Sequence, residues 1–342
     1  MKAYKLAVVG ATGVVGQKMI EVLNEKKLPI DEYVFFASKR SAGKTIKFGN
    51  DIYIVKELTE QSLKENFDFA LFSAGGDTSL KYAPIAAQNG CIVIDNSSAF
   101  RMNEDVPLVV PEVNPEDLKW HNGIISNPNC STIQAVCALK PLDDAFGIKR
   151  IVYSTYQAVS GAGSKGLHDL ENGIQNYCDT NNFEESTDSN YELEKFPYPI
   201  FNNCLPHIDS FLENGYTKEE EKMINETRKI LKKSDLAVTA TTVRVPVFNS
   251  HCESINVELK SEFDLNSVIE ILSNAPGIIV EDTPSSNLYA IPTNVSGHDE
   301  VFVSRIRRDF SVQNGLNIWV VADNIRKGAA SNAVQILEKL IF

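Results

Sequence analysis

The chain has 342 residues, of which 43% are hydrophobic and 23% are charged, so it has a globular composition and the length of two domains. Its formal net charge of −12 argues against a nucleic-acid or membrane partner, and no apolar run approaches membrane-spanning length. Six cysteines without a CxxC pair, and a start that leaves no room for a signal peptide, predict a cytoplasmic protein without disulfides or a metal cluster.

The first 130 residues alternate between strand-like and helix-like patterns. Apolar runs predict strands at 6–9, 33–36, 69–72 and 91–94. A helical pattern follows the first of these strands to about Lys27, and another covers 80–87. This alternation predicts a parallel, doubly wound sheet of the Rossmann type.

From Arg150 onward the strand-like segments become longer and alternate between apolar and polar residues. We expect a mainly antiparallel sheet with helices on one face, built from strands at 151–157, 237–247, 254–259, 301–307 and 316–322. The polar stretch 179–195 predicts a loop or insertion, and 324–342 predicts an amphipathic helix that returns to the first domain. The chain is thus expected to be an α/β protein with domains at 1–130, completed by 323–342, and at 131–322.

Cys130 lies in a short polar turn, at the start of a segment in which apolar residues recur periodically. Ile133, Val136 and Leu139 recur there at helical spacing, so Cys130 is expected at a helix N-terminus. The N–H groups and dipole of such a terminus stabilise a thiolate, which makes Cys130 a candidate nucleophile. The alternative is a buried structural cysteine, which fits Cys91, Cys137 and Cys252 better.

A glycine-rich turn, GATGVVG, follows the first predicted strand and opens a helix. Gly10, Gly13 and Gly16 are spaced GxxGxxG, one residue off the usual dinucleotide fingerprint. Backbone N–H groups at this place would bind a pyrophosphate, although a tight turn without a ligand also uses glycine. After the second strand, Ser38, Arg40 and Ser41 lie in the basic segment SKRSAGK without a carboxylate, which favours NADP over NAD.

Several polar residues are candidates for anion binding and catalysis. Arg101 follows a strand in DNSSAFR, where its guanidinium could bind a phosphate or carboxylate, and Gln157 ends a strand before the flexible Ser160-Gly161 loop. Glu219 and Lys222 share one face of a helix, which could bind an ammonium and an anion. Arg244 lies in an apolar strand and needs a partner, and His251 is a candidate general base. Each could instead be structural or solvent-facing.

These segments, together with SNPNCSTIQ at 126–134, EEEKMINETRKIL at 219–231, VRVPVFNSHCES at 243–254 and DNIRKGAASNAVQI at 323–336, resemble the aspartate-β-semialdehyde dehydrogenase family along nearly the whole chain. The resemblance implies reversible, NADPH-dependent reductive dephosphorylation of aspartyl-β-phosphate to aspartate semialdehyde, on the route to lysine, threonine, methionine and isoleucine. It also implies a homodimer through the second domain and no metal.

The resemblance also implies a role for each matching residue. Cys130 would form the acyl thioester, His251 would be the acid–base catalyst, and Gln157 would position the substrate. Phosphate would be bound by Arg101, Asn129 and Lys222, the substrate ammonium by Glu219 and its carboxylate by Arg244. The NADP site would be lined by Gly10, Thr12, Gly13, Val14, Val15, Ser38, Arg40, Ser41, Ser160, Gly161 and Asn324.

Three alternatives stay open on the sequence. The run Glu219-Glu220-Glu221 leaves the register of the substrate glutamate uncertain by one residue. N-acetyl-γ-glutamyl-phosphate reductase uses the same thioester chemistry, but its cysteine normally follows a glycine, whereas Asn129 precedes Cys130 here. A dinucleotide-binding protein that has lost activity would be expected to lack the combination of Cys130, Gln157, Arg244 and His251.

Overall fold

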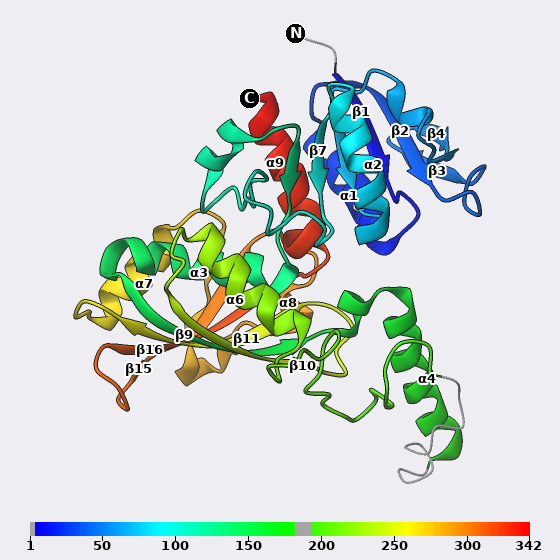
Figure 1. Cartoon of the computed structure of the whole chain (residues 1–342). Helices are drawn as coiled ribbons and strands as arrows, with labels where there is room; N and C mark the ends of the chain where they lie inside the picture. The colour runs from blue at the N-terminus through cyan, green and yellow to red at the C-terminus, as the bar shows by residue number, and fades with distance from the viewer. Residues whose placement is uncertain (1–3, 182–192) are drawn as a thin grey trace. The chain divides into compact units, whose positions relative to one another are not determined.

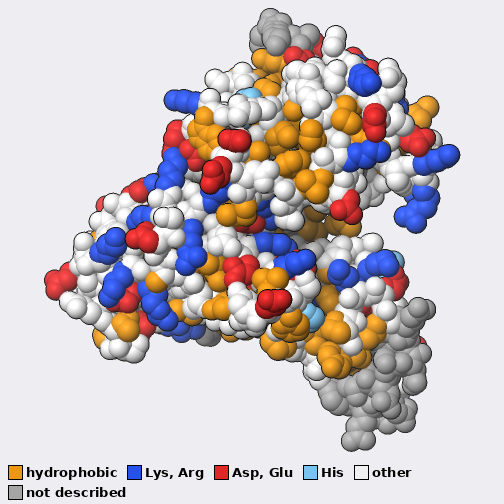
Figure 2. Space-filling view, in the orientation of Figure 1, with side chains coloured by type: hydrophobic (Ala, Val, Ile, Leu, Met, Phe, Trp, Pro, Cys, Tyr) orange, Lys and Arg blue, Asp and Glu red, His pale blue; other side chains and the backbone are white. Residues whose placement is uncertain are grey.

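The computed structural model describes residues 4–181 and 193–342, and it divides into two compact units (Figure 1). The first unit comprises 1–133, 229–233 and 326–342, and the second comprises 134–228 and 234–325. Among the described residues, no helix combines the length and the apolar character that a membrane crossing requires. On the face drawn in Figure 2, basic and acidic side chains are interspersed rather than gathered by sign.

The first unit is built on a six-stranded parallel sheet of order β5-β2-β1-β6-β7-β8. This confirms the predicted doubly wound sheet. Its strands and main helices are β1 (Tyr4–Val9), α1 (Val14–Lys26), β2 (Ile30–Ala37), β5 (Lys56–Glu57), β6 (Phe69–Phe72), α2 (Gly76–Gln88), β7 (Ile92–Asp95), β8 (Ile124–Ser126) and α9 (Ser331–Ile341).

Both faces of this sheet are buried because helices cover each of them. Leu6 and Val8 of β1 pack in one apolar cluster with α1 and α9, whereas Ala7 and Val9 pack in a second cluster with α2. This two-sided burial explains why the strands read as continuous apolar runs rather than as alternating patterns. The hairpin of β3 (Thr45–Phe48) and β4 (Asp51–Ile54) was not predicted, because its strands are short and mostly exposed.

The end of the chain differs from the single α-helix expected from residue 324. A π-helical turn, Arg326–Ala330, precedes α9, which begins only at Ser331. The turn buries the ammonium group of Lys327 completely, within 2.7 Å of a Glu112 carboxylate oxygen and 2.9 Å of the Gln335 amide oxygen. An amphipathic pattern alone does not reveal such a change of helical repeat.

The second unit is built on a mixed six-stranded sheet of order β10-β9-β11-β16-β15-β12. Its three inner pairings are antiparallel, as predicted, and the two edge strands β10 and β12 join in parallel. The strands of this sheet are β9 (Ile148–Gln157), β10 (Ala237–Arg244), β11 (His251–Leu259), β12 (Ile278–Val280), β15 (Val301–Asp309) and β16 (Gly315–Ala322), and β13 (Asp282–Thr283) and β14 (Leu288–Tyr289) form a separate pair. The helices are α4 (Ser164–Thr180), α6 (Lys218–Ile230), α7 (Leu265–Asn274) and α8 (Pro292–Val295). Helix α3 (Cys130–Phe146) begins in the first unit and continues into the second.

Several predicted boundaries in this unit were wrong. Strand β9 begins at Ile148 rather than at residue 151. Strand β10 ends at Arg244 rather than at residue 247, since Pro246 cannot donate to a sheet ladder. Strand β11 begins at His251 rather than at residue 254, which places the histidine within the sheet. Helix α4 continues through Thr180, so the predicted loop does not begin at 179, and most of that loop, 182–192, lies outside the described residues.

Candidate active site

The glycine turn of the first unit is required by close backbone contacts. Gly10 has φ +84°, and a Cβ there would lie 2.2 Å from the Ser73 carbonyl oxygen. A Cβ on Gly16 would lie 2.1 Å from the carbonyl oxygen of Gly10. Helix α1 starts directly after this turn, with Gly13 as its N-cap, so its first N–H groups face the turn. The arrangement suits a pyrophosphate, which binds at such helix N-termini.

The basic turn lies next to the glycine turn because β1 and β2 are neighbours in the sheet. Val9 pairs with Phe36, so the segments that follow both strands emerge at the same edge. Ser38 and Arg40 are exposed, whereas Ser41 is buried and its N–H donates to the Ser38 carbonyl at 2.8 Å. The residues predicted for the ribose phosphate therefore stand beside those predicted for the pyrophosphate.

Arg101 is buried and oriented by backbone carbonyls. Its Nε donates to the carbonyl oxygen of Asn127 at 2.9 Å, and its Nη2 donates to that of Asn96 at 2.9 Å. The loop after Arg101 is held in turn by Lys229, whose Nζ donates to the Arg101 carbonyl at 2.7 Å. Two backbone carbonyls therefore fix the orientation of the guanidinium, a group that binds anions such as phosphate.

Cys130 is the first residue of α3, as predicted. The side chain of Asn129 caps this helix, since its Oδ1 accepts from the N–H of Ser131 at 3.0 Å and from that of Thr132 at 3.4 Å. Cys130 is only partly buried. By contrast, burial raises the pKa of Cys91 to about 12, and it raises the pKa of Cys252 to about 12 together with the nearby Glu253. Cys130 thus combines accessibility with a thiolate-stabilising position.

In the second unit, three predicted residues form a row across the sheet. Arg244 of β10 pairs with Gln157 of β9, and Cys252 of β11 pairs with Tyr156, so His251 comes next to Gln157. All three side chains are at least nine-tenths buried. Strand β9, which precedes β10 and β11 by roughly 90 residues, therefore places its amide between a guanidinium and an imidazole.

His251 is held as a neutral imidazole. Its Nδ1 accepts from the backbone N–H of Ala158 at 3.0 Å, which leaves the ring proton of the neutral form on Nε2. Burial, with the positive charge of Arg244, lowers the pKa of His251 well below its usual value. Within the described part of the chain, Nε2 has no hydrogen-bond partner. The ring therefore presents a proton donor with no bond to break first.

Gly161 lies close against this row, where a side chain would not fit. A Cβ at this position would lie 2.9 Å from Nη1 of Arg244 and 3.1 Å from Nε2 of His251. The neighbouring Ser160 hydroxyl exchanges hydrogen bonds with the Asn324 amide at 3.0 to 3.2 Å, and Asn324 Oδ1 also accepts from the N–H of Ser250 at 2.9 Å. The residues predicted here for the cofactor are thus linked to the segment that leads into His251.

Helix α6 covers the same face of the sheet as α3 (Figure 1), and it brings a carboxylate to the row. Glu219 Oε1 accepts from the Gln157 amide at 3.2 Å, and its Oε2 lies 3.3 Å from the Lys222 ammonium. Glu220 instead uses both oxygens on backbone N–H groups, at 2.7 Å from Thr217 and at 3.0 Å from Thr242. Of the two glutamates, Glu219 is therefore the one that faces the row.

Two acidic residues near this row were not singled out by the sequence analysis. Asp209 lies 2.7 Å from the Lys222 ammonium. Glu253 lies two residues after His251 on β11, so it shares the face of the row, and it is completely buried. Burial raises the pKa of Glu253 well above its usual value, with a further contribution from Glu219. Strand alternation would have revealed Glu253 once the start of β11 was known.

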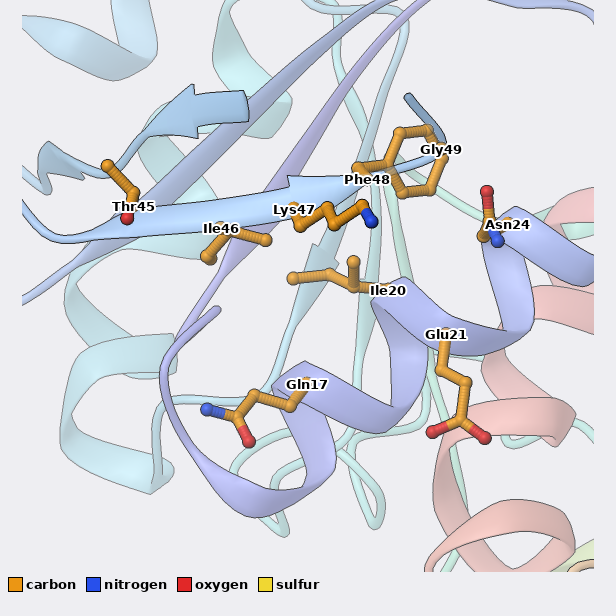
Figure 3. Close-up of a pocket in the computed structure, with 9 residues that line it drawn as sticks. All are labelled: Gln17, Ile20, Glu21, Asn24, Thr45, Ile46, Lys47, Phe48 and Gly49. Atoms are coloured by element: carbon orange, nitrogen blue, oxygen red, sulfur yellow. The ribbon is translucent and has the colours of Figure 1, made fainter. Parts of the chain in front are cut away.

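A separate groove of about 590 Å³ opens in the first unit between α1 and the β3–β4 hairpin (Figure 3). Ile20 and Ile46 form its apolar part, and Glu21, Asn24 and Lys47 its polar part. None of the residues predicted to bind the dinucleotide lines it among the described residues. Its lining residues Gln17 and Thr45 directly follow the glycine turn and the basic turn in the chain, so the groove borders the candidate cofactor site.

Comparison with known proteins agrees with this arrangement. The NAD-binding domain model of semialdehyde dehydrogenases matches residues 5–121, and the dimerisation domain model of the same enzymes matches residues 139–327. An aspartate-semialdehyde dehydrogenase of Aquifex aeolicus is 54% identical over 340 residues, which cover 99% of this chain and 98% of that protein.

Solved structures show the same likeness. Aspartate semialdehyde dehydrogenase II from Vibrio cholerae, complexed with ASA, has a TM-score of 0.93 and 45% identity, over 100% of this chain and 99% of that chain. The enzyme from Candida albicans with NADP has a TM-score of 0.75 and 26% identity over 100% of both chains.

The fold and the two matching models define a dehydrogenase with an NAD-binding half and a dimerisation half. The chain belongs to the aspartate-semialdehyde dehydrogenase family, and it is an oxidoreductase. The family predicted from the sequence is thereby confirmed.

Proposed function

We propose that the protein catalyses the reversible, NADPH-dependent conversion of L-aspartyl-4-phosphate to L-aspartate 4-semialdehyde and phosphate, in the biosynthesis of lysine, through diaminopimelate, and of threonine, methionine and isoleucine. The observation that carries this proposal is the row of Arg244, Gln157 and His251 with Glu219 beside it. A guanidinium and a carboxylate at the two sides of one amide match the α-carboxylate and the ammonium of an amino acid. The cytoplasmic location remains a prediction.

In this proposal Cys130 supplies the nucleophile. Its thiolate attacks the acyl phosphate, the carbon–oxygen bond to phosphate breaks, and a thioester forms. The helix start that stabilises the thiolate also offers N–H groups to the oxyanion that develops on the carbonyl. Covalent catalysis of this kind divides one difficult displacement into two easier steps. Gln157 holds the substrate carbonyl in place.

Phosphate leaves towards positive charge. Arg101 is oriented by the carbonyls of Asn127 and Asn96, Asn129 lies directly before the nucleophile, and Lys222 provides an ammonium from α6. These residues lie on both units, so the proposal requires Arg101 and Asn129 to act together with Lys222. In the reverse direction the same three groups bind inorganic phosphate for its attack on the thioester.

His251 is the acid–base catalyst of this proposal. When bound, the dinucleotide would supply a hydride to the thioester carbonyl. The Nε2–H group of the neutral imidazole would donate a hydrogen bond to the oxyanion that develops there, and this oxyanion would expel the Cys130 thiolate as the aldehyde carbonyl forms, so that no net proton is consumed. The lowered pKa of His251 favours the neutral ring that makes this contact.

The cofactor is proposed to be NADP. The glycine turn, with Gly10, Thr12, Gly13, Val14 and Val15, would bind the pyrophosphate, since its glycines cannot carry a side chain and α1 begins there. Ser38, Arg40 and Ser41 on the adjacent turn would bind the 2′-phosphate. Ser160, Gly161 and Asn324 would line the nicotinamide end.

The proposed domains follow from these roles. Residues 1–130 with 323–342 would bind the dinucleotide, and 131–322 would carry catalysis and dimerisation. The dimerisation model over 139–327 supports a homodimer through this second part.

The deciding experiment is phosphate-dependent reduction of NADP by the purified protein with aspartate semialdehyde, with NAD as the parallel cofactor. We expect NADPH to form only when phosphate is present, and NAD to be a poorer acceptor. Activity only with N-acetylglutamate semialdehyde would instead assign the protein to the acylated substrate. The absence of activity with both aldehydes, despite binding of NADP, would contradict the proposed catalysis.

A further inference from the structure

The ammonium of Lys222 is shared between two carboxylates. Its Nζ lies 2.7 Å from Oδ2 of Asp209 and 3.3 Å from Oε2 of Glu219. The shorter contact is therefore to Asp209, a residue to which the proposed chemistry gives no role. Because Lys222 is proposed to bind phosphate, whatever occupies its ammonium competes with that phosphate.

Asp209 stands on a segment that is fixed at both ends. Before it, Leu205 exchanges backbone hydrogen bonds with Arg244 at 2.8 and 2.9 Å, and after it, Ser210 accepts from the N–H of Lys218 at 2.9 Å. Asp209 itself has φ +68°, in the left-handed region that aspartate tolerates better than most residues. The carboxylate is thus presented to Lys222 by a defined backbone rather than by a loose surface loop.

Both groups are charged at neutral pH. Burial works against ionisation of Asp209, but the hydrogen bond and charge of Lys222 outweigh it, so the pKa of Asp209 is lowered from its usual value. A phosphate that approaches Lys222 therefore has to displace the Asp209 carboxylate from the ammonium.

We propose that Asp209 competes with phosphate for Lys222. In the phosphate-free protein its carboxylate binds the ammonium, and a phosphate group, free or on the acyl substrate, displaces it. Glu219 is less suited to this competition, because it also accepts a hydrogen bond from Gln157 and faces the row. Asp209 thereby sets the affinity for phosphate without touching the reacting carbon. The inference rests on the assignment of Lys222 to phosphate in the proposed function.

The test is Asp209→Asn in the full chain, which keeps the shape of the side chain and removes its charge. In the aldehyde-oxidising direction we expect KM for phosphate to fall roughly two- to fivefold, the range of a partly exposed ion pair, while kcat and KM for NADP stay within about twofold. The gain is expected to shrink as ionic strength rises, because salt screens exposed charges.

Glu221→Gln is the matched control. It removes one negative charge from the residue next to Lys222, but Glu221 contacts Asn214 at 2.8 Å and Asn225 at 2.9 Å instead of the ammonium. We expect this variant to leave KM for phosphate nearly unchanged. In a Lys222→Met background, Asp209→Asn should have no effect on KM for phosphate, because the ammonium for which it competes is absent.

Direct binding of inorganic phosphate, measured by calorimetry, separates this inference from the proposed function, because it needs no turnover. Tighter phosphate binding by Asp209→Asn supports the competition even if the reaction assignment fails. Weaker binding would show that Asp209 positions Lys222 for phosphate, and unchanged binding would show that it has no part in it. Either of these results overturns the proposal.

Discussion

In the first unit, Arg101 and Asn129 form hydrogen bonds with the backbone, whereas in the described part of the second unit the buried side chains of His251 and Glu253 contain polar atoms without a hydrogen-bond partner. Arg101 donates to two carbonyls, and Asn129 caps a helix. Among the described residues of the second unit, Nε2 of His251 and both carboxyl oxygens of Glu253 have no hydrogen-bond partner. Unsatisfied buried groups of this kind are costly and concentrate where a ligand or a proton is handled.

The difference follows from how each unit builds its site. Local turns and helix ends position the groups of the first unit, so neighbouring residues orient each other. The row of the second unit depends on sheet register between distant strands, and the register fixes which side chains meet. Substitutions in the first unit should therefore alter one ligand contact at a time, whereas those in the second should alter the whole row.

The largest expected effect is that of Cys130→Ala. Turnover should fall by at least ~10³-fold, because the thioester cannot form, while affinity for NADP stays within about twofold. Stopped-flow reduction of NADP and a fluorescence titration of the cofactor would measure the two quantities. Cys137→Ala, at a buried position on the same helix, is the control and should retain activity. A Cys130→Ala protein with a tenth of normal activity would exclude covalent catalysis.

A smaller but still large effect is expected for Gly161→Ala. The added methyl group would lie within 3.1 Å of both the Arg244 guanidinium and the His251 ring, next to the proposed substrate site. We expect kcat/KM for the aldehyde to fall by roughly 10²-fold, as small misplacements in an active site do. Gly76→Ala is the control, since a Cβ there meets no atom within 4 Å. Equal activity of the two variants would show that the space before the row is not the substrate site.

Arg40→Ala addresses a single contact of the first unit. Removing this exposed guanidinium should raise Kd for NADP by about tenfold, the value of one charge-assisted contact, and leave Kd for NAD unchanged. Lys39→Ala, a neighbouring exposed cation, is the comparison and should have the weaker effect. Equal loss of affinity for both dinucleotides would mean that the turn does not read the 2′-phosphate.

Glu253→Gln should have the smallest effect on turnover and a pH-dependent effect on stability. Burial raises the pKa of Glu253 in the folded protein, so the folded protein holds a proton that the unfolded chain releases above about pH 4.5, the usual pKa. The wild type therefore loses free energy of unfolding as pH rises above that value, and the neutral glutamine does not. Urea unfolding at pH 5 and pH 8, at fixed protein concentration, would measure this. The free energy of unfolding of the variant, relative to that of the wild type, should be higher at pH 8 than at pH 5.

Glu213→Gln is the control for that series, because Glu213 is exposed. The difference in free energy of unfolding between this variant and the wild type should be the same at the two pH values. If Glu253→Gln behaved in the same way, Glu253 would be ionised in the folded protein. A large loss of turnover in this variant would instead indicate that its proton takes part in the reaction.

The features that the sequence predicted well are local ones. The glycine turn and the placement of Cys130 at a helix start depend on residues within one or two turns of each other. Individual candidates in the second unit were also found, but their contacts depend on strand register, which no local pattern contains. One readable signal was missed. Thr217 and Glu220 form a capping box, which identifies Glu220 as structural and leaves Glu219 as the candidate for the substrate ammonium.

The core of the first unit has a consequence for the order of folding. Val334 and Leu337 of α9 are fully buried against β1 and α1, although more than 300 residues separate them in the chain. During synthesis the second unit is therefore complete before the first, whose early segments emerge with an apolar surface still uncovered. Until the ribosome has passed Leu337, the part of the protein that was made first remains the part most exposed to aggregation.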